Sequence, residues 1–142
     1  MRRALALSAL APVLVLAAAC GGGGGGGTRL AIIGCDGTPL TSAPSLPAGF
    51  PKPDGVTYVE TELRGPTTVV KGYVEAGLED AFDAYREAFD AAGYAILADE
   101  RETFDAEVAY EDPRGEVSGQ VALRDRCRES GRIALTITAR PA

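Results

Sequence analysis

The spacing of hydrophobic and polar residues changes near the middle of the chain. This change distinguishes the segments expected to form strands from the one expected to form a helix. The segments Val56–Leu63 and Thr67–Val74 are rich in Val, Thr and Tyr, and the short sequence Arg64-Gly65-Pro66 lies between them. Runs of β-branched and aromatic residues on either side of a Gly-Pro turn are typical of a β-hairpin. The pattern therefore predicts two paired strands over these segments.

The spacing of apolar residues then becomes helical. Leu78, Phe82, Tyr85 and Phe89 recur every three or four positions, which predicts an amphipathic helix over residues 78–92. Acidic residues occupy its other faces and its first turn, where they suit the helix dipole. Gly93 follows at the position of a left-handed C-terminal cap, so we expect the next residue to fold back onto the helix.

Four further apolar segments follow the helix. The first begins apolar, and the others alternate apolar with polar residues; they cover residues 94–100, 104–110, 117–123 and 133–139. A period of two indicates strands with one buried and one solvated face, which is the habit of antiparallel sheets. The order β-β-α-β-β-β-β predicts an α+β fold, in which one helix covers an antiparallel sheet of about six strands.

The segment before the hairpin, residues 28–54, has a different composition. It opens with the apolar run Leu30–Ile33 and continues with five prolines, which exclude a helix and disfavour a central strand. We interpret it as an extended arm that lies along the α+β domain of residues 55–142 and forms one unit with it. Leu46 and Phe50 are the expected anchors of the arm.

The N-terminus has the layout of an export signal. Two arginines follow Met1, and Ala4–Ala19 is a nearly continuous run of small apolar residues. Sixteen helical residues span about 24 Å, which is less than the roughly 30 Å of a bilayer core. This length favours the apolar region of a signal peptide over a transmembrane helix.

The run ends in Leu16-Ala17-Ala18-Ala19-Cys20, followed by seven glycines. This ending resembles the lipobox of bacterial lipoproteins, although that family prefers leucine where this chain has Ala17. The resemblance implies that residues 1–19 are a cleaved signal peptide and that Cys20 becomes a lipidated N-terminus carrying fatty acyl chains such as palmitate. The mature protein would then be held on the extracytoplasmic side of the cell membrane. Residues 20–27 would form a flexible tether of about 15 Å.

Two cysteines remain once Cys20 is lipidated. Export places Cys35 and Cys127 in an oxidising compartment, where we expect them to form one disulfide. The chain has no CxxC motif and no histidine, so neither a thioredoxin-like centre nor a histidine-assisted nucleophile is predicted.

The net charge and the distribution of charged residues limit the kinds of partner that the protein is expected to bind. The formal charge is −6, and loss of Arg2 and Arg3 with the signal leaves 12 basic against 20 acidic residues, or −8. Acidic and basic residues are interspersed without a basic stripe, which argues against nucleic-acid binding. A negative balance also opposes adsorption to anionic lipid, so the link to the bilayer must be covalent.

No catalytic residue, cofactor or metal is predicted. Four acids, Asp99, Glu100, Glu102 and Asp105, gather around one turn. Carboxylates of this kind could take calcium or magnesium, but the spacing is not that of an EF-hand, and we interpret the turn as solvated.

A binding role is the main functional hypothesis. Tyr58 and Tyr73 lie on neighbouring hairpin strands and would form a binding platform if both faced solvent. We therefore expect a membrane-anchored, non-catalytic accessory module that binds an envelope protein or a small ligand. The alternatives are a small envelope hydrolase that uses carboxylates only and an acidic surface domain that binds divalent cations.

Overall fold

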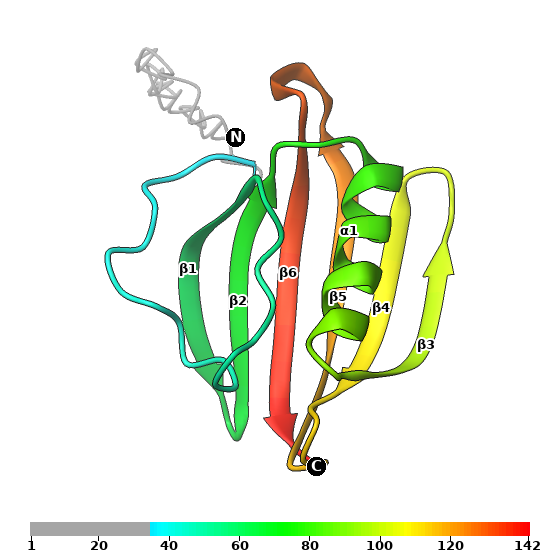
Figure 1. The fold of residues 1–142 in the computed structure, drawn as a ribbon. Helices are drawn as coiled ribbons and strands as arrows, with labels where there is room; N and C mark the ends of the chain where they lie inside the picture. Colours follow the sequence, from blue (N-terminus) through cyan, green and yellow to red (C-terminus); the bar gives the residue numbers. More distant parts are fainter. Residues whose placement is uncertain (1–34) are drawn as a thin grey trace, which may run out of the picture.

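The computed structural model describes residues 35–142, apart from the side chain of Arg128. The predicted signal peptide, Cys20, the glycine tether and the apolar run Leu30–Ile33 lie outside these residues. The described elements follow the expected order β-β-α-β-β-β-β (Figure 1). They are β1 (Val56–Arg64), β2 (Thr67–Val74), α1 (Leu78–Ala91), β3 (Ala95–Arg101), β4 (Asp105–Glu111), β5 (Val117–Cys127), a 3-10 turn (Arg128–Ser130) and β6 (Arg132–Pro141).

The strands form one antiparallel sheet in the order β1-β2-β6-β5-β4-β3. Helix α1 carries the chain from β2 to the opposite edge, where β3 begins a meander that returns inward. The last strand, β6, then fills the place between β2 and β5. The predicted α+β class and antiparallel sheet are confirmed. Because the meander β3–β4–β5 runs inward from the far edge, the C-terminal strand β6 takes a central position.

Helix α1 ends as the sequence predicts. Gly93 adopts a φ of 74°, and the Tyr94 N–H donates a hydrogen bond of 2.9 Å to the carbonyl oxygen of Phe89. This bond from the residue after the glycine is the mark of a Schellman cap, and it brings the Tyr94 and Phe89 rings to a centroid distance of 5.3 Å. The cap therefore directs the chain straight from the helix into β3.

The core lies on the face of the sheet that α1 covers. Alternate residues of the strands point toward it, among them Val70 of β2, Leu135 and Ile137 of β6, Leu123 of β5 and Val108 of β4, all fully or nearly fully buried. Four aromatic rings, of Phe50, Phe89, Tyr94 and Tyr110, meet at centroid distances between 5.0 and 5.9 Å. Helix, arm and sheet thus share one aromatic cluster.

Tyr110 reaches this cluster by lying across β5. Its partner in the ladder is Gly119, and its hydroxyl donates a hydrogen bond of 2.8 Å to the Thr138 carbonyl oxygen on β6. A Cβ atom at Gly119 would stand 2.7 Å from the Tyr110 hydroxyl oxygen, closer than atoms can pack. Glycine at this position therefore leaves the space in which the tyrosine ring lies.

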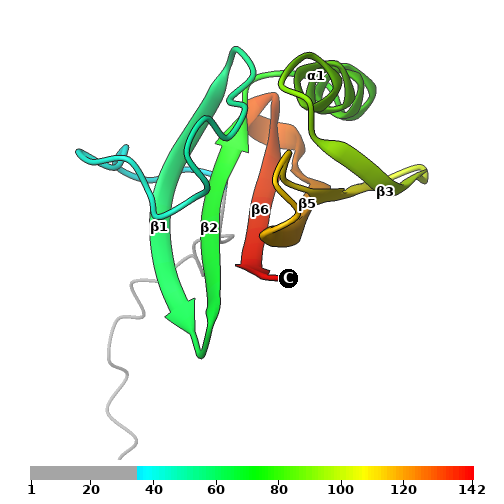
Figure 2. The same cartoon turned by 60° about the horizontal axis from the view of Figure 1, so that its bottom comes forward.

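The described part of the arm, residues 35–54, wraps around the β1 edge of the sheet (Figures 1 and 2). It begins at Cys35, which is joined to Cys127 by a disulfide with a Cα–Cα distance of 5.3 Å. The Leu40 N–H then donates a hydrogen bond of 2.9 Å to the Tyr58 carbonyl oxygen, and Leu46 and Phe50 pack against the core beside α1. The predicted disulfide and both predicted anchors are confirmed.

Candidate binding surface

The second face of the sheet carries mainly polar and charged side chains. Helix α1 and the anchors of the arm lie on the core face, and among residues 35–142 no helix covers the opposite side (Figure 2). We call this opposite side the polar face. Its central side chains are Glu60 and Glu62 of β1, Lys71 of β2, Thr136 and Thr138 of β6, Gln120 and Ala122 of β5 and Glu107 of β4.

Strand register arranges these side chains in rows that cross the sheet. Thr136 lies opposite Lys71 on one side and Ala122 on the other, and Thr138 lies opposite Val69 and Gln120. The two threonines therefore stand at the centre of the face, and Lys71 is the one charged residue among their ladder partners. Both are half-buried, and their hydroxyl groups are able to donate and accept hydrogen bonds.

An ion-pair network flanks the threonines on the β1–β2 side. The Lys71 side chain, only 14% exposed, places its Nζ atom 3.2 Å from a Glu60 oxygen and 3.3 Å from a Glu62 oxygen. Arg64 also pairs with Glu62, at 2.6 Å. Burial works against the charged form of Glu62, but the hydrogen bonds from Lys71 and Arg64 outweigh it and hold the pKa of Glu62 below its ordinary value.

A second network flanks the threonines on the β4–β5 side. Arg124 pairs with Asp105 at 2.9 Å and with Glu107, and the Gln120 amide also donates to Glu107. The Arg124 guanidinium further donates a bond of 3.1 Å to the Leu123 carbonyl oxygen. These bonds pair the charged side chains with one another, so a partner would meet mainly paired charges on this side.

The predicted acidic turn forms a shallow hollow of about 200 Å³ next to the polar face. Glu100, Glu102 and Asp105 line it as expected, together with Glu107 and Arg124. Asp99 instead faces α1, where it pairs with Arg86 at 2.5 Å. Because Arg124 already pairs with two of the lining acids, the hollow combines both charges. No cluster of acids or cysteines within residues 35–142 has the arrangement needed to hold a metal ion.

Tyr58 and Tyr73 do not share a face. Tyr58 lies opposite Gly72 and points into the core, with the Lys52 ammonium 5.1 Å from its ring centre. Burial raises its pKa to about 12, although the neighbouring Tyr85 hydroxyl acts in the opposite direction. Tyr73 follows Gly72 on β2 and therefore points to the opposite face of the sheet. There the Arg132 guanidinium stacks 4.0 Å from the Tyr73 ring centre. The structure therefore does not bring the two rings together as a platform.

Sequence reasoning missed the residues that form the centre of the polar face. The signal was present, because the alternation that buries Ile137 and Leu135 also places Thr136 and Thr138 on the opposite side. What the alternation did not show is which strands stand beside β6. Only the observed strand order brings Lys71 and Ala122 next to Thr136.

Comparison with other proteins adds no relative. No family model matches the chain, and no curated protein or solved structure matches it either. Within residues 35–142, no helix is both long and apolar enough to cross a bilayer.

Proposed function

We propose that the protein is an exported, lipid-anchored accessory module that binds a partner through its polar face. The observation that carries this proposal is the uneven covering of the sheet. Helix α1 and the arm anchors Leu46 and Phe50 pack on one face, and the other face retains a polar surface of paired charges.

The disulfide supports the exported part of the proposal. Bonds of this kind persist in oxidising compartments outside the cytoplasm. The Cys35–Cys127 bridge joins residues separated by 92 positions in sequence and fastens the start of the described chain to the end of β5. The lipobox-like ending at Cys20 lies only fifteen positions before this bridge. A lipid at Cys20 would thus attach the membrane to a fixed end of the sheet.

The chemistry of the polar face favours a protein partner. Its charged side chains are paired with one another, and its centre offers the hydroxyl groups of Thr136 and Thr138 beside Ala122. Non-obligate protein interfaces are shallow and about as polar as the rest of a protein surface, whereas small ligands usually occupy deeper pockets. We therefore expect an envelope protein as the partner.

Chemical cross-linking in the native membrane tests this proposal. Thr136→Arg places a large charged side chain at the centre of the polar face and should abolish the cross-linked adduct formed by the unaltered protein. Glu87→Arg, on the exposed side of α1, is the matched control and should retain the adduct. Circular dichroism and melting temperature would verify that both variants fold. Identical adducts from both folded variants would refute the polar face as the binding surface.

A further inference from the structure

Strand β3 forms an open edge of the sheet. It pairs with β4 on one side, and within residues 35–142 no strand pairs with its other side. All of its residues except Ile96 are exposed, and Leu97 is 58% exposed. In an antiparallel pair, the N–H and C=O groups of alternate residues point away from the partner strand. The outer side of β3 therefore offers backbone hydrogen-bonding groups to another chain.

The opposite edge of the sheet, at β1, is covered by the arm. The Leu40 N–H donates a hydrogen bond of 2.9 Å to the Tyr58 carbonyl oxygen, and a Cβ atom at Gly37 would stand 3.0 Å from that of Val59. Open edges are a liability because they are templates for pairing with other chains. The arm removes this liability at β1. Within the described chain, β3 is therefore the edge that is still able to accept a strand.

The register of β3 defines the stretch with which an added strand would pair. A bulge between Ile96 and Ala98 interrupts the ladder with β4, and the pairing is continuous over Ala98–Arg101. An added strand would pair with this regular stretch. The exposed Leu97 side chain, next to it, would supply an apolar contact.

Acidic side chains of α1 flank the edge on the core side. Arg86 of α1 pairs with Asp99 of β3 at 2.5 Å, so this side of the helix faces β3. Asp83 and Asp90 lie three residues before and four residues after Arg86, which places them on the same side of the helix. Both are exposed, and no ion pair within residues 35–142 uses them.

Acidic side chains also flank the edge on the side of the polar face. Glu100 lies opposite Glu107 in the β3–β4 ladder, and like charges directly opposite one another in a sheet repel. Glu107 is paired with Arg124, whereas Glu100 makes no ion pair with any described residue. A cationic side chain on the far side of Glu100 would therefore complete this row.

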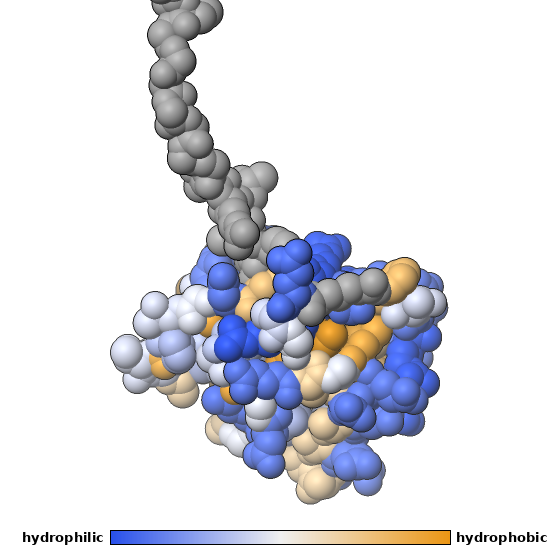
Figure 3. Space-filling model, turned by 90° about the horizontal axis from the view of Figure 1, so that it is seen from above, coloured by the Kyte–Doolittle hydropathy of each residue, from blue (hydrophilic) through white to orange (hydrophobic). Residues whose placement is uncertain are grey.

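The net charge of this region selects the kind of partner. Residues 78–104, which contain α1, β3 and the turn that follows, carry eight carboxylates and two arginines, a formal charge of −6. The right-hand rim of Figure 3, on the side where Figure 1 places β3, is mostly hydrophilic. Pairing of two β3 edges would bring two acidic surfaces together, so a second copy is repelled. A basic segment is attracted.

We propose that the β3 edge binds a basic segment of another protein, which joins the six-stranded sheet as an additional strand. Backbone hydrogen bonds to β3 supply affinity, and lysine or arginine side chains beside Asp83, Asp90 and Glu100 supply specificity. The proposal is independent of the polar face and of lipidation at Cys20.

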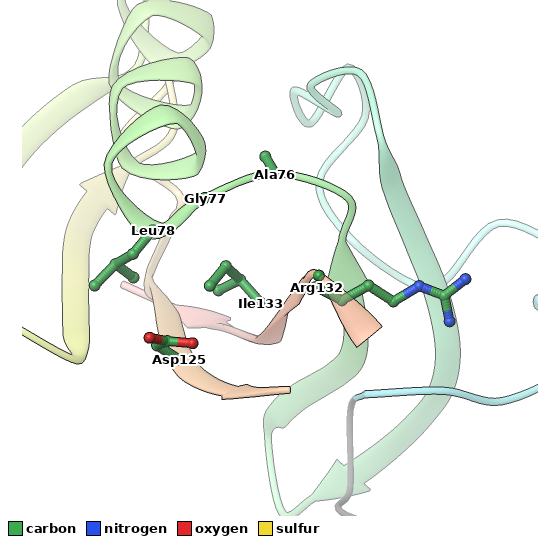
Figure 4. A pocket seen from close by; sticks show the side chains of 7 residues that line it. Ala76, Gly77, Leu78, Asp125, Arg132 and Ile133 are labelled. Atoms are coloured by element: carbon green, nitrogen blue, oxygen red, sulfur yellow. The ribbon is translucent and has the colours of Figure 1, made fainter. Parts of the chain in front are cut away.

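A second hollow offers a basic chain an alternative place to bind. It measures about 420 Å³ and lies between the β2–α1 connection and the start of β6 (Figure 4). Ala76, Leu78 and Ile133 line it and Asp125 lies at its side, while the Arg132 side chain extends away from it. Strands β5 and β4 separate β6 from β3. The hollow and the β3 edge can therefore be altered separately.

Fluorescence anisotropy with a labelled peptide tests the proposal. The probe is a short synthetic peptide of alternating lysine and threonine, added to the protein as it is purified from its own cells. It should bind, and the same peptide with glutamate in place of lysine should not. The lysine peptide N-methylated at every residue keeps its charge but has no N–H group to donate. It should bind more weakly by about tenfold or more.

Substitutions in the protein locate the binding. Asp83→Lys combined with Asp90→Lys reverses two charges beside β3 and should weaken binding of the lysine peptide by about tenfold or more. Asp36→Lys combined with Asp54→Lys makes the same change of charge at exposed positions of the arm and should retain binding. Thr136→Arg should also retain it, which separates this surface from the polar face. Amide hydrogen exchange in β3 should become slower when the peptide is bound.

Four outcomes would overturn the proposal. The first is that the lysine peptide does not bind. The second is equal binding of the methylated and unmodified peptides, which would indicate charge attraction without strand pairing. The third is loss of binding in a folded Ala76→Arg variant but not in the variant altered at Asp83 and Asp90, which would place the peptide in the hollow. The fourth is protection of the β3 amides without peptide that rises with protein concentration, which would assign the edge to a second copy.

Discussion

Phe89 is the side chain at which helix, arm and sheet converge. It is 0% exposed, and its ring lies 5.0 Å from that of Tyr110 and 5.6 Å from that of Phe50. Phe89→Ala should therefore lower the free energy of unfolding by about 3–5 kcal/mol, measured by chemical denaturation. Leu97→Ala, at a position that is 58% exposed, should change it by less than about 0.5 kcal/mol. Equal, small losses at both positions would contradict the observed packing of α1.

Asp112 organises the turn between β4 and β5. Its carboxylate accepts bonds of 2.8 Å from the Val117 N–H and 2.7 Å from the Glu116 N–H. The Val117 bond is the main cause that lowers the pKa of Asp112; burial opposes the shift, and Arg114 adds to it. A pKa that is lower in the folded state contributes stability above the unfolded value of about 3.9. That contribution is lost as the pH falls through the folded pKa.

Asp112→Asn should consequently destabilise the protein at pH 7, because an amide cannot supply the charge that these N–H groups bind. The difference from the unaltered protein should shrink as the pH falls below about 4, where the native carboxylate also becomes protonated. Melting temperatures measured across this range would show the convergence. Asp83→Asn, on the exposed side of α1, serves as control. If the melting temperature of Asp112→Asn stayed below that of the unaltered protein by the same amount at every pH, the charge of the carboxylate would not contribute to stability.

Residue types alone could not place Tyr58 and Tyr73. A shift of one residue in strand pairing moves every side chain to the other face of a sheet. The observed register sets Tyr58 opposite Gly72 and Tyr73 opposite Thr57, and a bulge follows between Tyr58 and Glu60. Sequence reasoning identified both as neighbours in a hairpin, which is correct. It lacked the register that sends one ring to the core and the other to Arg132.

At the scale of elements, the residue pattern of each segment predicted whether it forms a strand or a helix more accurately than it predicted the length of the element. The alternation predicted a strand over residues 117–123, yet β5 continues through the charged residues that follow to Cys127. A register shift between Arg124 and Cys127 accommodates this extension. Bulges of this kind depend on the partner strand and on the disulfide, and neither is visible in the alternation of a single segment.

The arm depends on its two kinds of attachment. Replacing Cys35 and Cys127 together by serine should lower the free energy of unfolding by on the order of 4–5 kcal/mol, if the bridge acts mainly on chain entropy. Limited proteolysis should then cut within residues 36–55 while the sheet of β1–β6 persists. Phe50→Ala in the oxidised protein is the informative comparison, because it removes the aromatic anchor and keeps the bridge. Resistance of the arm to protease in the double serine variant would show that its apolar anchors alone are sufficient.

For the whole molecule, one helix is too narrow to cover a six-stranded sheet. Helix α1 packs against β3, β4 and β5, and the side chains of Leu40, Leu46 and Phe50 from the arm join the same core. The arm thus covers surface that another fold would assign to a second helix. Residues without secondary structure thus contribute to the core, and a disulfide joins the start of the described arm to the sheet.

If Cys20 is the lipid anchor, as proposed, the same geometry would give it a mechanical role. If Cys20 carries lipid, its pull on the chain is received at Cys35 and passes through the disulfide to the end of β5. Cys20→Ala should then release the protein from the membrane or block its processing. Mass spectrometry of the membrane-extracted, unaltered protein should show a diacylglycerol-modified cysteine at the N-terminus.

The double serine variant of Cys35 and Cys127 separates anchoring from folding, since it should stay membrane-bound while its arm becomes protease-sensitive. A fully processed and membrane-bound Cys20→Ala protein would show that attachment depends on another part of the chain.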